Sequence, residues 1–155
     1  MPFDFRRAGL GLGAFLLQWM VLGRLSIYGS TPDIVLLYIA WYALQTNRRA
    51  GAIAGFLLGT ALDVAYGTWG IHMFVKTLVG FLLGTFAVDE RDALLIQPQQ
   101  AFLGGLTLAL LHNGLLVTLL ALQTSASNDF LIASLWLGAA AYTACVATLL
   151  SVLQA

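Results

Sequence analysis

The chain has 155 residues, of which 60% are hydrophobic and only 9% are charged, against about a quarter charged in ordinary soluble domains. This composition excludes a soluble globular protein and predicts an integral membrane protein built as one domain, residues 1–155. The formal net charge is zero, so bulk electrostatics gives no reason to expect a nucleic-acid partner.

Six continuous apolar segments predict an all-α bundle of six transmembrane helices. Most of them approach the roughly 20 residues that a helix needs to cross a bilayer. The second segment is shorter, so we expect it to lie where the bilayer thins or the neighbouring helices tilt. The six predicted helices are residues 8–28, 32–46, 50–66, 70–88, 101–122 and 130–153.

The first segment and the basic residues indicate the topology. No small-residue cleavage site follows segment 8–28, so we expect an uncleaved anchor rather than a signal peptide. Cytoplasmic connections carry the excess of arginine in membrane proteins, and arginine here gathers before the first segment and in two connections. This pattern predicts that both termini lie in the cytoplasm. The five arginines are Arg6, Arg7, Arg48, Arg49 and Arg91.

The second segment has a recognisable start. Thr31 suits the N-cap, Pro32 the first helical position, and Asp33 the first turn, where a carboxylate interacts favourably with the helix dipole. We therefore expect this helix to begin at Pro32.

Glycines recur every four residues in the third and fourth segments, "GAIAGFLLGTALDVAYGTWG" and "IHMFVKTLVGFLLGT". Small residues at this spacing let two helices approach closely in lipid. The sequence leaves two interpretations open, which are packing within the predicted hairpin and docking of a partner helix. The glycines concerned are Gly51, Gly55, Gly59, Gly80 and Gly84, and weaker pairs are Gly9 with Gly13, Gly105 with Ala109 and Ser134 with Gly138.

Asp63 and Lys76 are ionisable residues inside apolar segments, where a charge near mid-membrane costs about 2.5–3.5 kcal/mol. Counted from the turn at 67–70, their depths differ by about two residues, or roughly 3 Å of rise, with His72 one turn from Lys76. Three interpretations stay open: a structural ion pair, the polar floor of an outward-facing cavity, and a proton or ion relay. His112 and Asn113 add polar groups in the fifth segment, which we expect to hydrogen-bond to a neighbouring helix.

The remaining segments give no sign of catalysis or of a cofactor. Residues 89–100 and 123–129 have the composition of connecting loops. No nucleophile, phosphate-binding or metal-ligand motif occurs, and Cys145 is the only cysteine. Without further acids near the two histidines, a metal site is poorly supported. We therefore expect a protein that is not an enzyme and holds no cofactor or metal.

The sequence resembles the MreD family of rod shape-determining proteins. The resemblance rests on "PDIVLLYIAWYAL", the basic turn "NRR" and "GFLLGTALDVAYGTWGIHMF", and it covers nearly the whole length. Lys76 departs from the family pattern. The resemblance implies a non-enzymatic subunit of the cell-elongation complex in the bacterial inner membrane, surrounded by membrane lipid. The partners that it implies are MreC and, through MreC, MreB, RodA and a class B penicillin-binding protein.

The resemblance also implies a fold similar to the S components of energy-coupling-factor vitamin transporters. This similarity raises an alternative function, the binding of a small molecule as such a component. A vitamin binder needs a polar cavity built from long outer loops. The predicted outer loops are short and have few hydrogen-bonding residues, which favours the scaffold.

Overall fold

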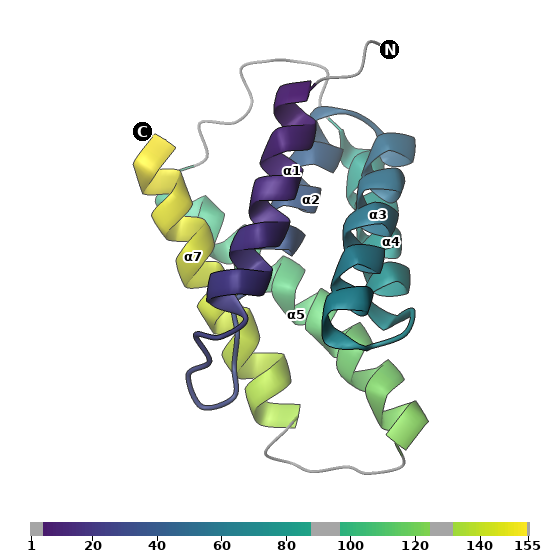
Figure 1. The fold of residues 1–155 in the computed structure, drawn as a ribbon. Coiled ribbons are helices and arrows are strands. Elements are labelled where there is room, and N and C mark those ends of the chain that lie inside the picture. Colours follow the sequence, from purple (N-terminus) through teal and green to yellow (C-terminus); the bar gives the residue numbers. More distant parts are fainter. Residues whose placement is uncertain (1–4, 88–96, 125–131, 155) are drawn as a thin grey trace. The chain divides into compact units, whose positions relative to one another are not determined.

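The computed structural model describes residues 5–87, 97–124 and 132–154 (Figure 1). Within these residues the fold is all-α, with six α-helices and no strand beyond one isolated bridge between Ile27 and Ser30. The chain divides into two compact units. The first contains helices α1 to α4, and the second contains residues 22–33 together with helices α5 and α7.

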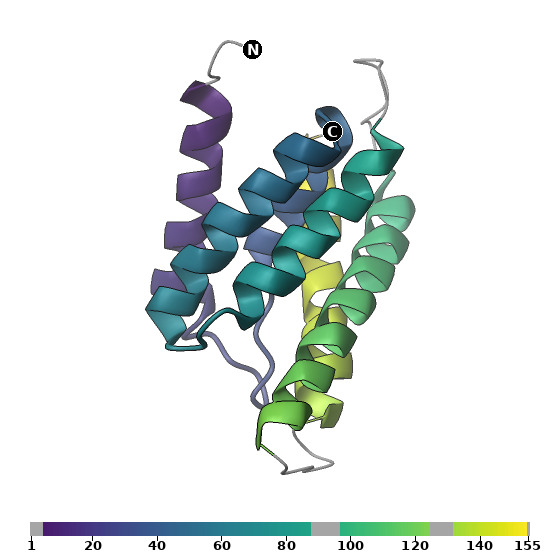
Figure 2. The ribbon, with the colours of Figure 1, turned by 90° about the vertical axis from the view of Figure 1, so that its right-hand side faces the viewer.

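The first unit is built around the hairpin of α3 and α4. Both views show these two helices lying side by side and antiparallel (Figures 1 and 2). Val35, Ile39 and Leu62 form the centre of its core, because helix α2 places its buried face against the hairpin. Its elements are α1 (Phe5–Leu17), the π-helical turn η1 (Gln18–Leu22), α2 (Ile34–Gln45), α3 (Arg48–Tyr66), α4 (Ile71–Leu83) and the 3₁₀ turn η2 (Gly84–Phe86).

The second unit pairs α5 (Pro98–Thr124) with the π-helical turn η3 (Ala133–Gly138) and its continuation α7 (Ala139–Gln154). Gly105 allows close packing, since a Cβ there would lie 2.9 Å from the Cβ of Ala147. Two hydrogen bonds attach the loop of residues 22–33. The Ser30 hydroxyl donates to the Ser134 carbonyl (2.8 Å), and the Asp33 amide donates to the Thr143 hydroxyl (3.0 Å).

The first helix is shorter than predicted, ending at Leu22 instead of residue 28. Ile27 and Ser30 exchange two backbone hydrogen bonds of 3.0 and 2.9 Å across Tyr28 and Gly29. Both central residues have positive φ, 51° and 80°, which is the geometry of a tight turn and incompatible with a helix. Hydropathy alone extended the predicted helix to residue 28, because Ile27 and Tyr28 are apolar although they are exposed.

Helix α2 begins two residues later than predicted, at Ile34, and its cap is different. The Ile34 amide donates to the side-chain carbonyl of Gln18 (2.9 Å), in place of the predicted cap from Thr31. The fifth helix begins early, at Pro98, where proline suits the first helical position because it has no N–H to satisfy. The predicted loop 123–129 and most of 89–100 lie outside the described residues.

Two helical segments of the described chain are long and apolar enough to cross a membrane, Pro98–Leu122 and Ala133–Leu153. The apolar helices Ile34–Gln45 and Ile71–Phe86 are shorter. At 1.5 Å per residue, the 12 residues of α2 span roughly 18 Å, less than the roughly 30 Å hydrocarbon core. The all-α fold is therefore confirmed, while six membrane crossings and a single transmembrane domain stay predictions.

Candidate functional site

The glycines of the third and fourth segments lie where α3 and α4 meet. Gly51 and Gly80 face each other, Gly55 faces the backbone of Lys76, and Gly84 faces that of Arg48. A Cβ at Gly59 would lie 2.6 Å from the Cα of Met73. The two helix backbones are thus in contact over the length of the hairpin.

This contact determines how the glycine repeat is used. All five glycines are buried, and any side chain at them would collide with the backbone of the other helix. Close backbone approach supplies the van der Waals packing that associates helices in lipid. The repeat is therefore covered within the chain, and a partner helix has no access to it.

The turn between the two helices depends on two further glycines. Gly67 ends α3 with φ at 70°, and Gly70 precedes α4 with φ at 86°. Both values fall in the left-handed region that favours glycine. The amides of Gly67 and Thr68 both donate to the carbonyl of Asp63. This arrangement closes the end of α3 and brings the first turn of α4 over the Asp63 side chain.

Asp63 caps the N-terminus of α4 from the neighbouring helix. Its carboxylate accepts hydrogen bonds from the amides of His72 (3.0 Å) and Met73 (2.9 Å) and from the hydroxyl of Thr68 (2.9 Å). The first amides of a helix have no partner within it, and a carboxylate there also interacts favourably with the helix dipole. The side chain is only 6% exposed, so the charge is stabilised by these three donors.

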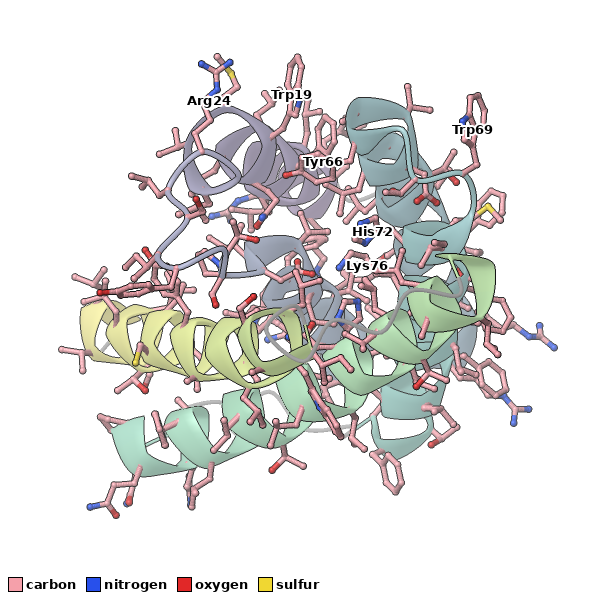
Figure 3. The ribbon with its side chains drawn as sticks, turned by 90° about the horizontal axis from the view of Figure 1, so that it is seen from below. Trp19, Arg24, Tyr66, Trp69, His72 and Lys76 are labelled. Carbon is pink, nitrogen blue, oxygen red and sulfur yellow. The ribbon has the colours of Figure 1, made fainter. Side chains whose placement is uncertain are left out.

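The Asp63 carboxylate is used in this cap, and the ion pair between Asp63 and Lys76 stays a prediction. Lys76 lies opposite Gly55, which precedes Asp63 by eight residues, or roughly 12 Å of helical rise. Counting residues from the turn underestimated the difference in depth between Asp63 and Lys76, because Asp63 lies level with the turn itself. Lys76 is completely buried, and Figure 3 shows it with His72 on a different side of the hairpin from Trp69.

The other predicted polar residues divide between the two units. His72 is half-buried on α4, and its ring lies 6.0 Å from that of Tyr66. His112 and Asn113 are buried on α5, where the His112 Nδ1 and the Asn113 Oδ1 are 2.9 Å apart. This bond joins neighbours in the sequence, and the expected hydrogen bond to a neighbouring helix stays a prediction.

Sequence reasoning missed Gln18 as a structural residue. Its side chain is 5% exposed and caps α2 from the end of the first helix. The available signal was a lone glutamine inside an apolar segment, since such a group needs a hydrogen-bond partner when it is buried. Within residues 5–87, 97–124 and 132–154, no three His, Cys, Asp or Glu side chains come together to hold a metal ion.

The candidate site is therefore a glycine-packed hairpin with an aspartate cap. It is built from the segment that carried the family resemblance. The family model described as rod shape-determining protein MreD matches residues 10–154. The chain belongs to the MreD family. No curated protein and no solved structure matches it significantly.

Membership of the MreD family implies a role in the determination of rod shape by a membrane protein. Cell elongation and peptidoglycan synthesis are the processes to which this role belongs. The family is one of shape-determining proteins and is not a known family of enzymes. In this MreD-family chain, Asp63 caps the N-terminus of α4.

Proposed function

We propose that this MreD-family protein is a scaffold and regulatory subunit of the cell-elongation complex, and that it docks the membrane helix of MreC. Through MreC it connects to MreB, RodA and a class B penicillin-binding protein. The observation that carries the proposal is the family match over residues 10–154. A scaffold of this kind needs a rigid framework and an apolar surface for its partners.

The hairpin of α3 and α4 supplies the rigid framework. Its glycines are covered within the chain, so the partner helix requires another surface. Helix α1 offers one, because Gly9 and Gly13 are exposed, with no atom within 4 Å of a Cβ added at either. Leu10 and Leu12 beside them are more than half exposed. Small and apolar residues together favour helix docking in lipid, so we place the MreC helix on this face of α1.

The distribution of residues along the first unit supports an inner-membrane location with both termini in the cytoplasm. Trp19, Tyr66 and Trp69 are exposed on η1, at the end of α3 and in the turn that follows it (Figure 3). Arg48 and Arg49 occupy the opposite end of α3. Aromatic residues favour the headgroup level, and arginine favours the cytoplasmic side. The proposed topology therefore puts the turn at 67–70 outside.

Affinity purification from native membranes in mild detergent, analysed by mass spectrometry, tests the proposal. We expect MreC and RodA to be recovered. Gly13→Leu should lose MreC at unchanged abundance, because its side chain enters open space within the chain but blocks the docking face. Gly104→Leu on α5 is the matched control, since a Cβ at Gly104 also meets nothing within 4 Å.

Two results would contradict parts of this proposal. Loss of MreC with Gly104→Leu but not with Gly13→Leu would move the docking face from α1 to α5. Recovery of coupling ATPases instead of MreC would favour the alternative function, an S component of a vitamin transporter. The scaffold proposal also includes a fold similar to that of S components, so the recovered partners distinguish the two functions.

A further inference from the structure

The second unit contains an open apolar groove between α5 and the π-helical turn η3. Its volume is about 490 Å³. One wall is the face of α5 that carries small residues, and the other is formed by η3 and the residue before it. The lining residues used below are Gly114, Thr118, Ala121, Leu122, Ile132 and Trp136.

Trp136 forms the far wall through a specific contact with α5. Its indole Nε1 donates to the carbonyl of Leu110 (2.9 Å). The ring reaches this carbonyl by passing over Gly114, where an added Cβ would lie only 3.3 Å from Nε1. Trp136 lies within the π-helical turn, a local geometry that often marks functional sites. The groove is therefore a built feature, held by one hydrogen bond and one glycine.

The polar groups of the groove are already satisfied. Thr118 donates its hydroxyl to the carbonyl of Gly114 (2.8 Å), and Trp136 uses its only donor on Leu110. Among the residues that the structure describes, the other lining side chains are apolar or absent. A polar ligand would lose its hydrogen bonds to water on entering and gain none from these described residues, so their chemistry favours an apolar occupant.

Size and position distinguish between the apolar occupants. One turn of helix, about 10 Å across and 5.4 Å long, fills roughly 400 Å³, so the groove accommodates about one turn. A membrane-crossing partner helix of about 20 residues would leave most of its length outside. Both walls belong to the two segments that are long and apolar enough to cross a membrane. Leu122 and Ile132 lie near the ends of these segments, where a lipid headgroup would meet the water.

We propose that this groove binds one acyl chain of a membrane phospholipid, with the headgroup at the level of Leu122 and Ile132. The bound chain covers the small-residue face of α5 and the exposed side of Trp136. This inference is independent of MreC docking on α1, because the groove lies wholly on α5 and η3.

Photo-crosslinking tests the proposal on the full-length protein in phosphatidylethanolamine–phosphatidylglycerol vesicles. The probe is a phosphatidylethanolamine with a diazirine in its acyl chain, and adducts are mapped by mass spectrometry. We expect several-fold more adducts on Trp136 and Thr118 than on Leu111, which is 66% exposed on α5 but does not line the groove.

A pair of variants separates groove binding from general lipid contact. Ala121→Phe fills the groove from an exposed position and should lower labelling of Trp136 several-fold. Gly104→Phe adds the same ring to α5 where there is open space and should leave labelling of Trp136 unchanged. Equal labelling of Leu111 and Trp136 in the wild type would overturn the proposal in favour of unspecific surrounding lipid. In native membranes, a photoreactive amino acid placed at position 136 that crosslinks to another polypeptide instead of lipid would overturn the proposal in favour of a partner helix.

Discussion

Removing the Asp63 carboxylate is the most direct test of the hairpin architecture. Asp63→Ala deletes the acceptor for the amides of His72 and Met73 and for the Thr68 hydroxyl. Loss of a helix cap costs about 0.5–2 kcal/mol, and a buried donor left without an acceptor costs about 1–3 kcal/mol. Some of the donors that lose the carboxylate will find other acceptors, so we expect a total loss of about 2–4 kcal/mol in the free energy of unfolding.

The assay is thermal unfolding in mild detergent, followed by size-exclusion chromatography of the folded fraction. For a chain of this length, the expected loss corresponds to a fall in Tm of roughly 5–15 °C. Asp63→Asn keeps one acceptor oxygen and should lose less. Val64→Ala is the matched control, because Val64 adjoins Asp63 but is 75% exposed, and its Tm should stay close to that of the wild type.

A double-mutant cycle with Lys76→Leu distinguishes the cap from the ion pair that the sequence predicted. If Asp63 acts as a cap, the losses from Asp63→Ala and Lys76→Leu should add to within about 0.5 kcal/mol. An ion pair would behave differently, since removing the second charge would restore stability lost with the first. A double variant more stable than either single variant, or an Asp63→Ala protein as stable as Val64→Ala, would refute the capping argument.

Three further predictions concern the hairpin, the cap of α2 and the topology. Gly59→Leu should sharply lower the amount of folded protein, because the leucine side chain would collide with the α4 backbone. Gly13→Leu on α1 should leave the amount unchanged, and equal yields of the two variants would contradict the close packing of α3 against α4. Gln18→Leu should destabilise the protein by about 1–3 kcal/mol by leaving the Ile34 amide unsatisfied, measured as a lower Tm, and an unchanged Tm would rule out this cap. In cells, a cysteine at Gln97 should be labelled from the inside and one at Ser127 from the outside; labelling of both from one side would exclude the proposed topology.

The class of protein and much of its local structure followed from the sequence, because these depend on composition and on short-range patterns. Long apolar segments predict helices, and glycine every fourth residue predicts a close helix contact. The turn at 67–70 also follows, since only glycine adopts positive φ there without strain. The motifs of this same segment were enough to indicate the MreD family.

Only the tertiary structure decided how the polar residues are used. Asp63 and Lys76 were matched by counting along each helix separately, but their relative level depends on the register of α3 against α4, which the glycine contacts set. Gln18 finds its partner 16 residues away, and Trp136 reaches α5 by passing over Gly114, where a Cβ would lie 3.3 Å from its indole Nε1. The end of the first helix likewise depended on the turn at Tyr28 and Gly29, which hydropathy does not detect. Helix formation is a local property, whereas a buried hydrogen bond requires two particular groups to meet, and that meeting is determined by packing.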